Sequence, residues 1–233
     1  MSNKIHKSVS LIGRIALVVM FVVAATMVIL SAAGYRLELT NKEFVQTAMI
    51  AVKALPRNAN LTINGQIYEP DNLWRINNLN PGRYDIEVSK PTYNSWEKTV
   101  TIEAGQNALY EDVILFLTKP TESPVDSNTE KSRLVTDLNN QKPATELVHN
   151  KNEIYFDSNL VTRYSSEIFN AQVYSDNAHV TFISGDKFHV IDLDGSNDNV
   201  LFDLKNDSKY ILLNGGQNVL CLEGDKLRMM KIR

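Results

Sequence analysis

The chain has 233 residues, and its 24 Lys and Arg against 27 Asp and Glu give a net charge of −3. This balance argues against bulk binding of nucleic acid, because neutralising phosphates requires an excess of cations on one face. The length predicts one or two domains. The apolar residues are unevenly distributed, since residues 15–33 read IALVVMFVVAATMVILSAA and contain no charge.

The first predicted element is a transmembrane helix over residues 15–35. Nineteen apolar residues in a helix span roughly 28 Å, close to the roughly 30 Å thickness of the hydrocarbon core of a bilayer. A secretory signal peptide is the alternative, because Lys4 and Lys7 form a basic start and Ser31–Ala33 is typical of a cleavage site. The apolar stretch exceeds the usual 7–15 residues or so of a signal peptide, which favours retention in the membrane.

The distribution of charge predicts the orientation. Lys4, Lys7 and Arg14 precede the apolar segment, and the first fourteen residues contain no acidic side chain. The positive-inside rule therefore predicts a cytoplasmic N-terminus and an ectodomain outside the cytoplasmic membrane.

Short strand-like runs separated by turn residues extend from Thr47 to Leu117 and predict an all-β domain. Asn64-Gly65 between two such runs predicts a hairpin, because a type I′ turn needs positive φ at both central residues. Pro81-Gly82 predicts a type II turn. The strand after it alternates apolar and polar residues over 83–88, and the run 113–117 predicts a strand buried on both faces.

These residues resemble the PEGA domain, a small exported β-sandwich of bacterial and archaeal envelope proteins. The resemblance rests on four segments: PRNA with Pro56 and Ala59, LTINGQ, NPGRYDIEV, and KPTYNSWEKTV with Tyr93 and Trp96. Arg57 and Asn58 occupy the middle of the first segment. The resemblance implies a domain exposed to the cell envelope, with cell-wall glycan or surface-layer protein as a partner.

Three aromatic residues are the candidate ligand-binding residues: Trp74, Tyr93 and Trp96. Flat aromatic faces stack on sugar rings, so these residues would contact a glycan. The competing interpretation is structural, because large aromatic side chains commonly fill the core of a small sandwich or cover its open end.

Residues 119–133 read KPTESPVDSNTEKSR and contain one hydrophobic residue, Val125. Such a segment buries too little apolar surface to offset its ordering entropy, which predicts a flexible linker extending to residue 143.

The rest of the chain, residues 144–233, returns to short strands with Gly-containing turns. Two similar stretches begin near Asn177 and Gly216, an offset of about forty residues that is typical of four-stranded propeller blades. The region resembles TolB-type and WD-type blades. A closed ring needs about four to eight blades, so the sequence predicts a partial propeller whose edges require a cover.

Recognisable catalytic and metal-binding motifs are missing. Asp192, Asp194 and Asp198 do not fit the EF-hand loop, and His179 and His189 have no zinc-ligand spacing. Cys221 lies in an apolar run, as expected of a small core residue. We therefore expect no catalytic residues, no metal site and no cofactor.

The sequence thus predicts an all-β ectodomain behind one transmembrane helix. The expected domains are a cytoplasmic tail (1–14), the helix (15–35), a PEGA-like sandwich (36–118), a linker (119–143) and a blade-like region (144–233). The expected function is a non-enzymatic binding or scaffolding ectodomain on the cytoplasmic membrane, in contact with the lipid bilayer, cell-wall polysaccharide, surface-layer protein or another envelope protein. The alternatives are a subunit whose partner completes the propeller, and a propeller-based hydrolase.

Overall fold

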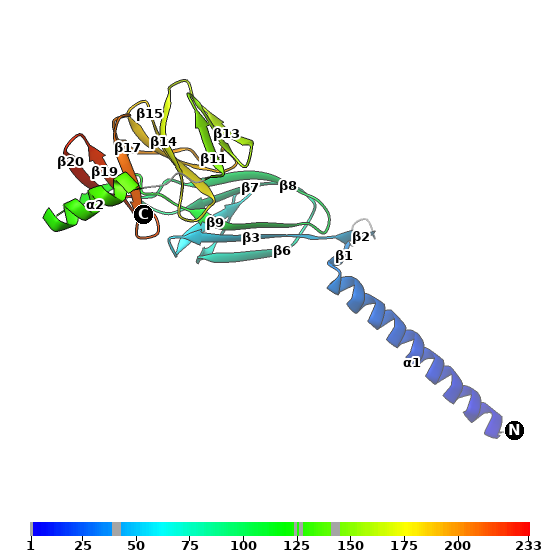
Figure 1. Ribbon diagram of the computed structural model, residues 1–233. Coiled ribbons are helices and arrows are strands. Elements are labelled where there is room, and N and C mark those ends of the chain that lie inside the picture. Colours follow the sequence, from blue (N-terminus) through cyan, green and yellow to red (C-terminus); the bar gives the residue numbers. More distant parts are fainter. Residues whose placement is uncertain (1, 39–42, 124, 126–127, 141–144) are drawn as a thin grey trace. The chain divides into compact units, whose positions relative to one another are not determined.

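The computed structural model describes residues 2–38, 43–123, 125, 128–140 and 145–233 (Figure 1). The N-terminal part contains a helix and nine strands: α1(Ser2–Ala32), β1(Tyr35–Glu38), β2(Glu43–Gln46), β3(Ala48–Leu55), β4(Ala59–Ile63), β5(Gln66–Asp71), β6(Leu73–Leu79), β7(Gly82–Ser89), β8(Trp96–Ile102) and β9(Asn107–Ile114). The C-terminal part contains β10(Thr121–Ser123), α2(Asn128–Asn140), β11(Leu147–Asn150), β12(Glu153–Phe156), β13(Asn159–Arg163), β14(Ile168–Val173), β15(His179–Ser184), β16(Lys187–Asp192), β17(Asn199–Asp203), β18(Lys209–Leu213), β19(Asn218–Glu223) and β20(Lys226–Lys231).

Helix α1 contains the apolar segment that the sequence predicts to cross a membrane. Its part Gly13–Ala32 has a mean hydropathy of 2.8, and none of the most apolar stretch is buried in the protein. The one hydroxyl in mid-segment, on Thr26, donates to the Val22 carbonyl at 2.8 Å, so its hydrogen bond is satisfied within the helix. The helix is long and apolar enough to span a bilayer or to serve as a signal sequence.

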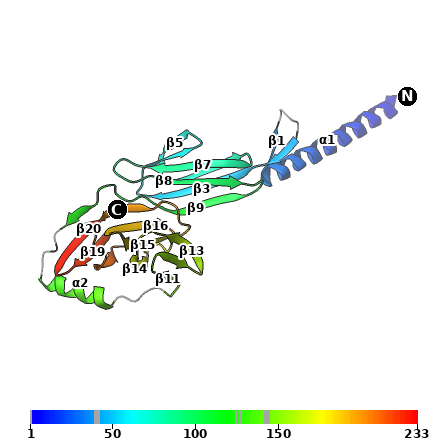
Figure 2. The same ribbon diagram turned by 90° about the horizontal axis from the view of Figure 1, so that it is seen from above.

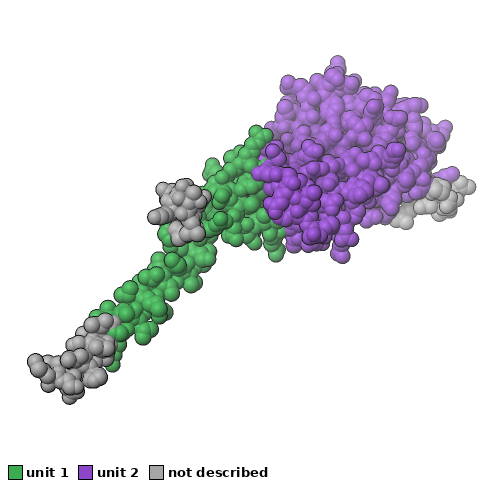
Figure 3. All heavy atoms as spheres, turned by 180° about the vertical axis from the view of Figure 1, so that it is seen from behind, with its two compact units in different colours: residues 1–51, 75–84, 101–109 green, residues 52–74, 85–100, 110–233 purple. Residues whose placement is uncertain are grey.

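Contacts divide the chain into two compact units, coloured separately in Figure 3. The smaller unit comprises residues 1–51, 75–84 and 101–109, and the larger unit comprises 52–74, 85–100 and 110–233. The larger unit therefore contains both part of the predicted sandwich and all of the C-terminal sheets.

The predicted sandwich contains two sheets with strand orders β6-β3-β9 and β5-β4-β7-β8 (Figure 2). Strand β4 pairs antiparallel with β5 and β7. Strands β3 and β9 run parallel, since the Met49 N–H donates to the Gln106 carbonyl and the Leu115 N–H donates to the Leu55 carbonyl. Strand β4 alternates fully buried with half-buried residues, as expected of a strand with one face in a core. The predicted hairpin is confirmed: Asn64 and Gly65 have φ of 48° and 80°, and Ile63 pairs with Gln66.

The second predicted turn differs from the sequence prediction. Gly82 has φ of 158°, an extended value, and begins β7, whereas a type II turn requires about +80° at this position. The nearest left-handed residue before it is Asn78, within β6, with φ of 60°.

The segment predicted as a linker contains two regular elements. Strand β10 pairs with β20, with Thr121 opposite Lys231, and Glu122 forms an ion pair with Arg228 at 3.2 Å. Helix α2 buries Leu138 in a small apolar cluster with Ile211 and Leu220. Pairing with an existing sheet edge supplies the backbone hydrogen bonds that a segment poor in apolar residues cannot obtain by packing alone.

The C-terminal region contains three sheets, with strand orders β11-β12-β13, β14-β15-β16-β17 and β10-β20-β19-β18. The two similar stretches of sequence fold as equivalent hairpins, β15–β16 and β19–β20. Among the described strands these sheets do not form a closed ring, so the likeness to propeller blades stays a prediction.

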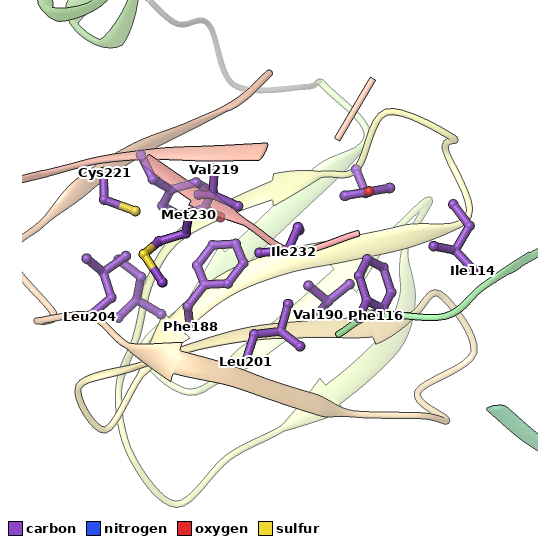
Figure 4. Packing of buried hydrophobic residues seen from close by; sticks show 13 residues of the cluster. Ile114, Phe116, Phe188, Val190, Leu201, Leu204, Val219, Cys221, Met230 and Ile232 are labelled. Atoms are coloured by element: carbon purple, nitrogen blue, oxygen red, sulfur yellow. The ribbon is translucent and has the colours of Figure 1, made fainter. Parts of the chain in front are cut away.

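A large core lies between the second and third of these sheets (Figure 4). Phe188, Val190 and Leu201 of the second sheet pack in one cluster with Val219 and Met230 of the third. The cluster also contains residues from the end of the predicted sandwich, Ile114 and Phe116.

Cys221 is fully buried in this cluster, as the sequence predicts. Burial raises the pKa of its thiol to about 12, because the thiolate is poorly solvated there.

Candidate functional site

The structure places the three predicted aromatic residues in different environments. Trp74 is 6 % exposed, and its indole N–H donates to the Glu69 carbonyl at 2.9 Å. Both the ring and its polar atom are therefore used within the protein. The arrangement favours a packing role for Trp74.

Trp96 is 5 % exposed and joins the predicted sandwich to the C-terminal sheets inside the larger unit. Its indole N–H donates to Asp192 Oδ2 at 2.9 Å, and its ring meets the edge of Tyr110 at a centroid distance of 5.4 Å. These contacts likewise favour packing over stacking on a sugar. The ligand role of both tryptophans stays a prediction.

The carboxylate that accepts from Trp96 also contacts a buried histidine. Asp192 Oδ1 lies 3.2 Å from His179 Nε2, and Asp176 Oδ2 lies 2.6 Å from His179 Nδ1. Desolvation lowers the pKa of His179, but the two carboxylates outweigh it and raise the pKa to about 9. His179 is therefore a buried cation held between two carboxylates near neutral pH.

Polar contacts extend this junction along β8. The Asn197 side chain accepts from the Glu97 backbone N–H at 2.9 Å and donates to the Glu97 carbonyl at 3.1 Å. Lys98 forms an ion pair with Asp194. Because these groups bond side chains of one region to backbone of the other, β8 is fixed against the loop that follows β16.

A second polar cluster joins Tyr164, His189 and Asp198. His189 Nδ1 lies 3.0 Å from Asp198 Oδ1 and 3.2 Å from the Tyr164 hydroxyl, which also donates to Asp198. Burial, followed by the Asp198 carboxylate, raises the pKa of Tyr164 above its ordinary value. The His189 ring stacks on Phe182, so we interpret the cluster as a satisfied structural network.

Tyr93 is the predicted residue that borders an open cavity. It is half-buried and lines a pocket of about 360 Å³ with five other residues. The complete lining is Leu55, Pro56, Arg57, Tyr93, Gln217 and Arg233. Two guanidinium groups, an amide and a phenol can bind an anionic or polyhydroxylated ligand.

Sequence reasoning identified Tyr93 but missed Arg57, Gln217 and Arg233 as members of the same site. Arg57 stands in the segment that carries the family resemblance, where its exposed position in a turn was the available signal. Gln217 lies in the turn before β19 and Arg233 follows β20, and no pattern in the sequence associates them with Tyr93.

The histidine, cysteine and acidic residues form no cluster of three or more suited to a metal ion anywhere in the part of the chain that the structure describes.

Comparison with known proteins identifies one domain. Residues 47–111 match the PEGA domain family, which confirms the resemblance drawn from the sequence for this part of the chain. No curated protein matches the chain. The region after residue 111 is therefore characterised by its structure.

Proposed function

We propose that this chain is a non-enzymatic, single-pass envelope protein whose β-rich ectodomain binds a glycan or protein outside the cytoplasmic membrane. The observation that carries the proposal is an exposed apolar helix, Gly13–Ala32, directly preceding a PEGA domain. The helix supplies the anchor and the β-rich part supplies the binding surface.

The charges beside the helix support the orientation. Lys4, Lys7 and Arg14 lie before the apolar segment, whereas the first acidic residue of the chain is Glu38. By the positive-inside rule this asymmetry retains the N-terminus in the cytoplasm and exports the remainder.

Rigid presentation supports a binding role for the ectodomain. The contacts of Trp96, Glu97 and Lys98 with the loop after β16 hold part of the PEGA domain against the C-terminal sheets within the larger unit. A fixed geometry reduces the entropy lost when a ligand contacts both regions.

A subunit role is the second candidate. The sheet β11-β12-β13 has three strands, whereas the two following sheets have four. A strand from another envelope protein would complete the smaller sheet by β-strand addition.

Orientation and anchoring can be tested with single cysteines in a Cys221→Ser background. We expect a membrane-impermeant maleimide to label Asp225→Cys in intact cells and Ser8→Cys only after lysis. Full-length mass in the membrane fraction is expected for a retained helix. Labelling in the opposite pattern would contradict the orientation, and a chain shortened near Ala33 would contradict the anchor.

Binding can be tested by retention of the detergent-solubilised full chain on isolated cell walls. We expect wild type to be retained and Trp96→Phe to be retained equally, because the phenyl ring preserves most of the packing. Failure of wild type to bind would contradict a cell-wall partner.

A further inference from the structure

The pocket beside Tyr93 has a charge opposite to that of the whole chain. None of its six lining residues is acidic, whereas the chain has a net charge of −3. Lys90 lies next to it and donates from Nζ to the Arg57 and Asn58 carbonyls. Three cationic side chains thus gather around a cavity that presents no carboxylate side chain.

Several polar side chains that line this pocket have no hydrogen-bond partner within the part of the protein that the structure describes. Within the described residues, the Arg57 guanidinium, the Tyr93 hydroxyl and the Gln217 amide make no hydrogen bond or ion pair. Arg233 donates from Nη2 to the Gly215 carbonyl at 3.0 Å, and it also lines an adjoining cavity that contains Glu111, Asp112 and Asp176. In Trp74 and Trp96, in contrast, the indole N–H, which is the one donor of the side chain, already donates to an acceptor of the protein.

Residues 115–117 fix the walls of the pocket. Leu115 donates to the Leu55 carbonyl at 2.8 Å, and Leu117 donates to the Ile232 carbonyl at 2.9 Å. Tyr93 forms a β-bridge with Leu117, and Ile232 donates to the Gln217 carbonyl at 2.9 Å. The backbone segments that carry the lining residues are therefore bonded to residues 115–117, either directly or through one further hydrogen bond. A ligand would thus bind to a preformed site.

We propose that this pocket binds an acidic sugar unit, bearing a carboxylate or a phosphate, of an envelope glycan. Arg57 and Arg233 bind the anionic group, because a guanidinium matches carboxylate and phosphate geometry. Tyr93 packs against the sugar ring, and the Gln217 amide bonds a hydroxyl group. The proposal rests on the proposed function and names its ligand class.

A separate surface cavity on the PEGA domain is unsuited to such a ligand. Its lining contains Asp85, Glu87 and Glu97 beside Lys98. These carboxylates would repel an acidic glycan, so the two cavities provide an internal contrast.

Calorimetric titration of the detergent-solubilised full chain tests the proposal with three probes: a galacturonate tetramer, a glycerol-phosphate oligomer and neutral maltotetraose. We expect at least one anionic probe to bind and maltotetraose not to bind. The stronger of the two anionic probes distinguishes a uronate from a phosphate polymer. Arg57→Gln is expected to weaken binding about tenfold or more, since a charge-assisted hydrogen bond is lost. Tyr93→Ala is expected to weaken it similarly.

Arg75→Gln is the matched control, because Arg75 is also exposed but lies outside the pocket. It should leave the affinity unchanged. Equal binding of maltotetraose, binding of no anionic probe, or an equal loss in Arg57→Gln and Arg75→Gln would overturn the proposal. Undiminished retention of Arg57→Gln on cell walls would overturn the pocket alone, whereas absence of retention in wild type would overturn the wider function.

Discussion

The PEGA domain and the C-terminal sheets have different interiors. Buried residues of β4 and β7 in the PEGA domain are aliphatic, such as Leu61, Ile86 and Val88. In the described residues every buried polar or charged side chain lies in the C-terminal region: His179, Thr181, Ser184, His189 and Ser208. The first interior consists mainly of apolar side chains, with the Trp74 N–H bonded to the Glu69 carbonyl. The second interior also pairs buried polar groups, except for the Ser208 hydroxyl, which has no partner among the described residues.

The two interiors should lose stability in different ways. Removing an apolar side chain leaves a cavity, but removing one partner of a buried polar pair leaves an unsatisfied group as well. Substitutions and pH changes should therefore affect the two regions in different ways, and Trp96 should affect both because it contacts Asp192.

The largest effect is expected for Trp96→Ala. It removes a buried ring and the donor to Asp192, and should lower the free energy of unfolding by about 4 kcal/mol. Urea denaturation of the full chain, followed by tryptophan fluorescence and far-UV circular dichroism, would measure it. We expect one shared transition in wild type and two separate ones in the variant. Separate transitions in wild type would contradict the prediction that Trp96 couples unfolding of the PEGA domain to unfolding of the C-terminal sheets.

A smaller effect is expected on raising the pH. His179 has a pKa of about 9 in the folded protein against an ordinary value of 6.5. The folded state then binds more protons between these values, so the stabilisation is complete below about pH 6.5 and is lost as the pH rises through 9. The loss should be about 3 kcal/mol.

The measurement is urea denaturation at pH 6 and pH 9.5. His179→Gln should remove most of the pH dependence, and His149→Gln, at an exposed position, should preserve it. Equal pH dependence in both variants would show that His179 is not the titrating group.

The smallest of the three effects is expected for Gly216→Ala. Gly216 has φ of +79°, and a Cβ there would lie 2.2 Å from the Tyr174 ring, whose hydroxyl donates to the Gly216 carbonyl. We expect a loss of about 2–3 kcal/mol. Gly215→Ala is the matched control, with φ of +62° and open space around its Cβ position, and should cost about 1 kcal/mol. Equal losses in thermal denaturation would show that Tyr174 relaxes away.

Local chemistry explains what could be predicted from sequence. Asn64-Gly65 specified its turn because both residues tolerate positive φ. The alternation over 83–88 specified the buried face of β7, and continuous apolarity identified the exposed helix. In each case the signal and the structure lie within a few consecutive residues.

Long-range contacts explain what could not be predicted. Strand β10 has no strand-like pattern, and it is ordered by the free edge of β20. The pocket combines Arg57 and Tyr93 with Gln217 and Arg233, which are distant in sequence. Such positions are determined by the tertiary arrangement, so a single sequence without alignment contains little information about them.

The pairing of β10 with β20 constrains the order of biogenesis. Residues 121–123 leave the ribosome well before residues 229–231, so the partner of β10 does not yet exist at that point. The third sheet consequently stays incomplete until synthesis reaches β20, and its apolar face stays exposed during that interval.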